Sequence, residues 1–197
     1  MTKTIITLAF CMLLNACHDN PTSATTSPQL YPLAIGNYWK YQLPTAPVNQ
    51  PMPVTEFIDR DTIFGGQHWF RIRSDSLSQG GWFSNRSDGL ILYSSDSSSP
   101  LLVYKYPIHT NDKFFAFSSN DTVTVVDDHR HITTKAGDFD CLVYQRRSFI
   151  GGLSQVNYDD LYVAIGVGRV REEIYYYDSL MVRHSLGNAD LIEYAVK

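Results

Sequence analysis

From residue 31 onward the chain alternates apolar and polar positions over short runs that are separated by turn residues. No stretch keeps a 3.6-residue apolar period for three turns, so the sequence predicts no long helix. Alternation over runs of this length is typical of strands with one buried face. The expected strands are 38–43, 54–64, 68–74, 81–85, 90–94, 101–106, 114–117, 122–134 (with a bend), 139–148, 156–164, 170–177 and 191–196.

Glycine-containing turns separate many of these runs. Gly65-Gly66 and Ser87-Asp88-Gly89 supply the positive φ that tight hairpins need. The proline-rich piece 44–53 is expected to be a loop outside the ladders. About a dozen strands joined in this way predict an all-β fold, a single curved antiparallel meander. A sheet of that size is expected to close as a half-barrel, a barrel or two layers, filled by 13 Tyr, 10 Phe and 3 Trp.

The first thirty residues follow a different pattern. Lys3 precedes an apolar run over residues 5–14, which is about half the length of a membrane span. Leu14-Asn15-Ala16-Cys17 then resembles the lipobox of bacterial lipoproteins, in which the signal is cut before a cysteine that carries lipid. The resemblance implies a signal peptide over 1–16 and lipidation, with palmitate among the chains, at Cys17.

Residues 17–30 contain Ser, Thr and Pro and little to bury, so they are expected to form a flexible tether. Its root-mean-square reach is about 20 Å, which would hold a single β-rich domain over 31–197 close to a membrane. In lipoproteins an Asp after the lipidated cysteine retains many proteins at the inner membrane. Here His18 follows Cys17, so the resemblance favours the outer membrane of the cell envelope, facing the periplasm or the cell surface.

Charge and cysteine usage exclude some classes of function. Removing residues 1–16 removes only Lys3, which leaves 15 basic against 20 acidic residues and a net charge of −5. That acidity argues against nucleic acid as a partner. Of three cysteines, Cys11 leaves with the signal and Cys17 takes lipid. Cys141 therefore has no partner for a disulfide, and on its strand we expect it to be buried and inert.

Three elements of the folded part resemble a group of uncharacterised bacterial lipoproteins. Tyr-Pro-Leu-x-x-Gly-Asn-x-Trp-x-Tyr stands at 31–41, Ala-Gly-x-Phe-x-Cys at 136–141 and Gly-Val-Gly-x-Val at 166–170, and an apolar strand ends the chain. The resemblance implies a curved antiparallel sheet and no particular activity. Arg169 stands where these proteins usually have an apolar or neutral residue.

A short internal similarity links two parts of the chain. Tyr31-Pro32-Leu33 before Gly36-Asn37-Tyr38-Trp39 aligns without gaps on Tyr106-Pro107-Ile108 before Asn111-Asp112-Lys113-Phe114. In both, a proline is followed by a polar turn and an aromatic residue that opens a strand. Two structurally related halves would explain the similarity, and so would coincidence over only nine residues.

The best candidates for a metal site lie on one predicted strand. His129 and His131 would project from the same face with their Cα atoms about 7 Å apart, and Asp127 would share that face. Imidazoles and a carboxylate in that pattern can bind zinc. A solvated bend in a long strand explains the same residues and is the favoured interpretation, so no metal site is predicted and these three residues are only weak candidates.

Other patterns favour structure over chemistry. Gly166-Val167-Gly168 lacks the third glycine and the helix of a phosphate-binding loop. Adjacent acids at 127–128, 159–160 and 172–173 face opposite ways on a strand. Ser154 lacks the setting of a hydrolase nucleophile. Aromatics at 175–177 and 82–83 are expected to pack, although exposed ones could stack on sugars.

The sequence therefore favours a non-enzymatic envelope lipoprotein whose sheet binds an apolar ligand or a partner protein, without a cofactor. Two alternatives stay open. One is an envelope metal-dependent hydrolase built around His129 and His131, with Asp127 or Glu173 as the distant acid. The other is a glycan-binding module that uses exposed Tyr and Trp side chains.

Overall fold

Twelve β-strands form one antiparallel sheet in the computed structural model, which describes residues 29–43, 52–93, 99–116, 121–149 and 156–197. Within those residues every regular element is a strand, as the lack of a helical apolar period predicts. The strands are β1 (Tyr38–Leu43), β2 (Met52–Phe64), β3 (Gln67–Ser74), β4 (Leu77–Arg86), β5 (Gly89–Tyr93), β6 (Leu101–Lys105), β7 (Lys113–Phe115), β8 (Thr122–Thr134), β9 (Gly137–Phe149), β10 (Val156–Ala164), β11 (Gly168–Tyr177) and β12 (Arg183–Ala195).

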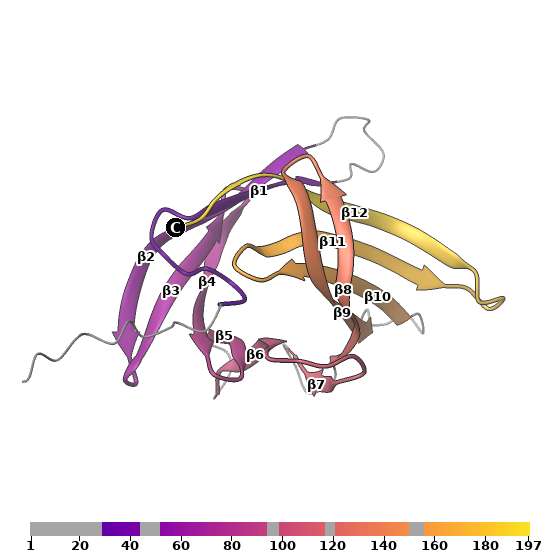
Figure 1. Ribbon diagram of the computed structural model, residues 1–197, viewed down its shortest axis with the longest axis horizontal. Coiled ribbons are helices and arrows are strands. Elements are labelled where there is room, and N and C mark those ends of the chain that lie inside the picture. The colour runs from indigo at the N-terminus through magenta and orange to yellow at the C-terminus, as the bar shows by residue number, and fades with distance from the viewer. Residues whose placement is uncertain (1–28, 44–51, 94–98, 117–120, 150–155) are drawn as a thin grey trace, which may run out of the picture.

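The sheet order is β6-β5-β4-β3-β2-β1-β12-β11-β10-β9-β8-β7, so the first and last strands of the chain pair with each other. Figure 1 shows how the sheet curls until β6 and β7, its two edges, lie near one another at the bottom of the view. The predicted all-β curved antiparallel meander is confirmed, and it takes the form of a nearly closed barrel. The described residues include no helix long and apolar enough to cross a bilayer.

Most strands differ from their predicted bounds by a few residues, and for β12 and β2 the reason is clear. β12 begins at Arg183, eight residues before the predicted start, because its polar first half pairs with β11 along Tyr177 to Arg171. Pro53 was expected in a loop but stands in β2 opposite Gln42. β3 ends at Ser74, opposite Glu56. The edge of β2 that faces away from β1 therefore has no strand beside it at Pro53, and the missing N–H of the proline interrupts no ladder.

The predicted bend in β8 is present and coincides with breaks in its ladder. Its register with β9 shifts between Val125 and Asp127 and again between Asp127 and Arg130. Beyond the bend, the tip of the β8–β9 hairpin reaches the first and last strands, where Lys135 Nζ donates to Gln42 Oε1 at 2.8 Å. Bulges increase local twist, which is what a sheet needs in order to curl over itself.

The segment 29–37 crosses the interior and links the two sides of the sheet (Figure 1). Leu30 and Tyr31 are buried at 2% and 4% exposure, and the Tyr31 ring lies 4.8 Å from that of Trp39. The Gln29 carbonyl accepts from Gly166 N at 2.9 Å, on the turn between β10 and β11. Leu30, which the sequence assigns to the tether, is therefore already part of the core.

The predicted repeat appears in the hydrogen bonds of the two opening turns. Before β1, Asn37 N donates to Ala34 O, Gly36 N to Ile58 O, and Ile58 N to Asn37 O. Before β7, Asp112 N donates to His109 O, Asn111 N to Val125 O, and Val125 N to Asp112 O. Gly36 and Asn111 both have positive φ, 91° and 73°. Each turn opens a meander of six strands, β1–β6 and β7–β12, so the similarity in sequence extends to the backbone of the two turns. That the halves themselves are related stays a prediction.

Candidate functional site

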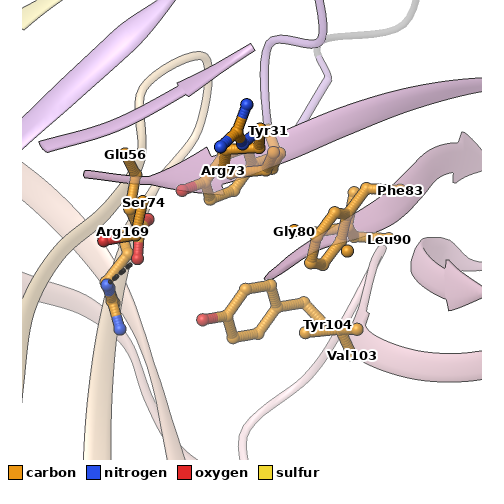
Figure 2. A pocket seen from close by; sticks show the side chains of 12 residues that line it. Tyr31, Glu56, Arg73, Ser74, Gly80, Phe83, Leu90, Val103, Tyr104 and Arg169 are labelled. Carbon is orange, nitrogen blue, oxygen red and sulfur yellow. Dashed lines mark hydrogen bonds and ion pairs between the residues drawn. The ribbon is translucent and has the colours of Figure 1, made fainter. Parts of the chain in front are cut away.

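A cavity of about 250 Å³ opens inside the curl of the first half. Its walls come from β3, β4, β5 and β6, and its far end comes from β2, β11 and the segment 29–37 (Figure 2). The lining residues are Tyr31, Glu56, Ile72, Arg73, Ser74, Gly80, Gly81, Phe83, Leu90, Val103, Tyr104 and Arg169.

β4 carries two glycines in succession at this wall, where neighbouring atoms leave no room for a Cβ. A Cβ added to Gly81 would lie 2.7 Å from the Phe83 ring and 2.8 Å from Leu92 Cδ1. A Cβ on Gly80 would lie 2.6 Å from Ile72 O. Contacts that short are not found in folded proteins, so any larger residue would displace these neighbours and disturb the wall.

Arg169 marks the polar end of the cavity. Its Nη2 donates to Glu56 Oε1 at 2.7 Å and its Nη1 donates to Glu172 Oε2 at 2.7 Å. The guanidinium carbon also lies 4.5 Å from the centre of the Tyr41 ring. Glu56 belongs to β2 and Glu172 to β11, so one side chain joins the two halves of the sheet.

Burial governs the electrostatics of this end. Side-chain exposure is 21% for Arg169, 25% for Glu56 and 18% for Glu172. Burial by itself disfavours the charge on Arg169, but the two carboxylates outweigh it, and the pKa of the guanidinium is raised above its ordinary value. Burial also raises the pKa of the Tyr104 hydroxyl to about 12, so this hydroxyl keeps its proton at neutral pH.

The Tyr104 hydroxyl is one polar group of the lining that remains available. It has no hydrogen-bond partner among the described residues, and it points across the cavity toward Arg169 (Figure 2). In the described residues, every side-chain nitrogen or oxygen that is fully shielded from solvent has a hydrogen-bond partner. The hydroxyl is therefore open to the cavity, where it can donate to or accept from a bound group.

The cavity is thus amphipathic. Ile72, Phe83, Leu90 and Val103 line one end, and Tyr104 stands beside the Arg169 ion pairs at the other. Because two carboxylates already neutralise Arg169, its charge is not free to bind an anion. An uncharged molecule with an apolar body and one hydroxyl or carbonyl group matches these walls.

The metal-site candidates do not converge. His129 Nδ1 contacts Asp128 Oδ1 at 2.8 Å, and His131 Nδ1 contacts Asp140 Oδ1 at 3.0 Å. Asp127 accepts instead from His129 N and Arg130 Nε, at 3.0 and 2.9 Å. Both imidazoles are exposed, and the described residues contain no group of three such ligands that could hold a metal ion.

Other predicted candidates have structural roles. Cys141 is fully buried, and burial raises the pKa of its thiol to about 12, which keeps it protonated and unreactive. Gly168 has a φ of 98°, and the Tyr31 ring lies 2.6 Å from where its Cβ would be. The close approach that this glycine allows is made by a side chain of the opening segment. Cys17 lies outside the described residues.

The aromatic run at 175–177 is mostly covered. Tyr175 is buried at 2% exposure, and Arg183 lies over its ring at 3.7 Å. Tyr176 stacks on His184 at 4.9 Å, and Tyr177 meets Tyr158 edge-on at 5.4 Å. These contacts leave no flat row of exposed rings for a sugar to stack on.

Sequence reasoning missed the cavity residues themselves. Glu56, Leu90 and Tyr104 lie on separate strands and have no local motif. The one available signal was Arg169, a charged residue in an otherwise apolar and glycine-rich element. Its contact with Glu56 spans 113 positions, which no local pattern reveals.

No protein-family model matches the chain, and no curated protein matches it. Two solved structures resemble it. A putative lipoprotein from Parabacteroides distasonis is 16% identical, with a TM-score of 0.45, over 85% of this chain and 99% of its own. A putative exported protein with a YmcC-like fold from Bacteroides fragilis is 13% identical, with a TM-score of 0.47, over 86% of this chain and all of its own.

Proposed function

We propose that the chain is a non-enzymatic cell-envelope lipoprotein that binds an uncharged amphiphile inside its curled sheet. The amphipathic cavity carries this proposal, because its apolar walls end at the unpartnered hydroxyl of Tyr104. A site of about 250 Å³ is slightly below the usual range for drug-sized ligands, so it suits a short apolar chain or a single ring system.

The polar residues of the site favour binding over catalysis. Glu56 and Glu172 are both held by Arg169, and among the described residues no base makes a hydrogen bond with the Tyr104 hydroxyl. A nucleophile needs an adjacent general base or a lowered pKa, and here burial raises the pKa of Tyr104 instead. These groups orient a ligand but do not activate one.

Displacement of an apolar fluorophore tests the binding. The mature protein should take up N-phenyl-1-naphthylamine with increased emission, and 1-octanol should displace it. Val103→Trp fills the cavity and should abolish uptake, whereas Val126→Trp, at an exposed site on β8, should not. Equal uptake by the Val103→Trp and Val126→Trp proteins would contradict the proposal.

A second variant tests the polar end. Tyr104→Phe removes the hydroxyl and keeps the ring, so displacement by 1-octanol should weaken about fivefold, the size expected for one hydrogen bond. Uptake of the fluorophore should hardly change. Unaltered displacement by 1-octanol would mean that Tyr104 does not bind the ligand's polar group.

The lipid anchor is proposed from Leu14-Asn15-Ala16-Cys17 and is tested separately. Labelled palmitate should be incorporated into the protein, and Cys17→Ser should prevent it. Globomycin should cause the precursor to accumulate. We propose that the anchor holds the protein at the outer membrane, because His18 follows Cys17. Density-gradient separation of the two membranes tests this, and recovery with the inner membrane contradicts it.

A further inference from the structure

The turn between β11 and β12 is unusual because three of its exposed side chains, in succession, are apolar. Leu180, Met181 and Val182 are 81%, 76% and 50% exposed. We call these three residues the apolar tip. Hairpin turns normally carry Gly, Asn, Asp or Ser, which suit water and tight backbone geometry. The hairpin extends beyond the rest of the domain at one end of its longest axis (Figure 1).

The polar groups of the turn are satisfied from within. Asp178 Oδ1 accepts from Leu180 N and Val182 N, both at 2.9 Å. Met181 N donates to Asp178 O at 3.0 Å, and Asp178 N donates to Val182 O at 3.1 Å. Asp178 Oδ2 contacts His184 Nε2 at 2.9 Å. A turn closed in this way can enter an apolar medium without exposing these backbone donors.

The backbone at Met181 indicates that the side chain there matters. Its φ is +61°, a conformation that glycine or asparagine adopts at lower cost. Methionine at this position accepts strain while adding apolar surface to the most exposed part of the hairpin. Strain held at an exposed position is more common at functional sites than elsewhere.

The charges at the base of the tip are paired. His184 meets Asp178, and Arg183 Nη2 donates to Glu173 Oε2 at 3.0 Å. The tip therefore combines a convex apolar surface with no excess of positive charge. That combination favours the interface of an uncharged membrane over an anionic one.

We infer that the apolar tip inserts into the lipid bilayer, at its interface, and fixes the orientation of the domain on the membrane. The inference rests on the proposed lipoprotein function, because Cys17 lies only 12 residues before Gln29 and would keep the domain near the membrane. A tethered domain with a second contact has a defined orientation, which sets where its cavity opens.

The test uses the full lipidated chain in vesicles of phosphatidylcholine and phosphatidylethanolamine. An NBD fluorophore is attached at Leu180→Cys or, as the matched control, at Ile63→Cys, which is 72% exposed near the end of another hairpin. Cys141 is buried and does not compete for the label. We expect a blue shift and quenching by nitroxide-labelled lipid at position 180 but not at position 63. Co-flotation with identical spectra at both positions would overturn the inference.

A second measurement separates the tip from the anchor. If the chain expressed for lipidation does not float with vesicles, the proposed lipid anchor is wrong. The Cys17→Ser chain, which carries no lipid, then tests whether the apolar tip binds vesicles by itself. Leu180→Ser with Met181→Ser should lower its vesicle partition about tenfold, from the apolar area lost. Ile63→Ser should leave the partition unchanged. Equal partition of all three proteins, or no partition by any of them, would overturn the inference.

Discussion

The two halves of the sheet begin alike and end differently. Both open with the same three backbone hydrogen bonds and continue as six-stranded meanders. The second half ends in β12, 13 residues long, which pairs with β1 and closes one seam. The first half ends in β6, only five residues long, which has no ladder with β7. Shortening one strand leaves that seam open, and the cavity lies beside it.

The side chains that face the interior also differ between the two halves. In the second half, Arg146 Nε donates to the buried Asp159 Oδ2 at 2.7 Å, and Leu161 and Tyr144 stand opposite one another. In the first half, β4 carries two successive glycines in the wall of the cavity. The two halves therefore use a similar succession of strands for different interiors.

Arg169 supplies the sharpest test, because it joins the halves. Arg169→Ala would leave two carboxylates in the interior without a counter-charge and should lower the free energy of unfolding by about 3–5 kcal/mol. Replacing all three groups, as Arg169→Met with Glu56→Gln and Glu172→Gln, should recover much of that loss.

Chemical denaturation of the purified variants measures the effect. Arg130→Ala is the control, because this arginine is 57% exposed and pairs with Asp127 at the surface, where a salt bridge contributes little. A loss for Arg169→Ala no larger than for Arg130→Ala would mean that the halves are held together by apolar packing alone.

The two opening turns allow a second test. Asn37 is fully buried, donates through Nδ2 to Pro32 O at 2.9 Å, and accepts at Oδ1 from Lys197 N at 3.1 Å. Asn37→Ala should cost about 2–3 kcal/mol, because buried groups lose their partners. Asp112 is half-buried and contacts Lys105 Nζ at 3.1 Å, so Asp112→Ala should cost clearly less.

The pH dependence distinguishes the two turns. The hydrogen bond from Lys105 holds the pKa of Asp112 below its usual range. A depressed folded pKa gives stability that is present above the unfolded value of about 3.9 and is lost as the pH falls through the folded pKa. The deficit of Asp112→Ala should vanish in acid, while that of Asn37→Ala persists. Thermal melts between pH 7 and pH 2 measure both, and parallel deficits would contradict the assignment.

Much of the fold follows from local chemistry in the sequence. Gly65-Gly66 has the positive φ that its turn requires, and Trp39 and Tyr41, two positions apart on β1, are both buried, as alternation along a strand implies. The repeat was readable because an aromatic-proline pair and a polar turn recur in the same order. These features depend on neighbours in the chain, which is why pattern reasoning reached them.

The cavity could not be reached in that way. It depends on which strands face each other after curling, and on the absence of side chains at Gly80 and Gly81, which reads in the sequence as an ordinary turn signal. The polar first part of β12 was missed for a related reason. This part of β12 is a strand because it pairs with β11, beginning with Arg183 opposite Tyr177. Its own sequence has no alternation of apolar and polar residues that would predict a strand.

The smallest predicted effect concerns Asp160, a largely buried carboxyl on β10, in the second half. Burial raises the pKa of Asp160, although Gln145 Nε2 and the Tyr175 hydroxyl both donate to its Oδ1, at 3.1 Å each. Because the folded pKa exceeds the unfolded one, stability is complete below about pH 4 and is lost as the pH rises through the folded value. Asp160→Asn keeps an oxygen to accept both bonds and removes the charge.

The variant should therefore be more stable than the wild type at pH 7, by up to about 1 kcal/mol, and equal to it at pH 3. Arg183 Nη2, 3.8 Å from Asp160 Oδ2, acts in the opposite direction and limits the gain. Urea denaturation of both proteins at the two pH values measures the difference. If the variant is less stable than the wild type at pH 7, the attraction between Arg183 and the Asp160 carboxylate outweighs the cost of burying the charge. The charge on Asp160 would then help to hold β10 and β12 together.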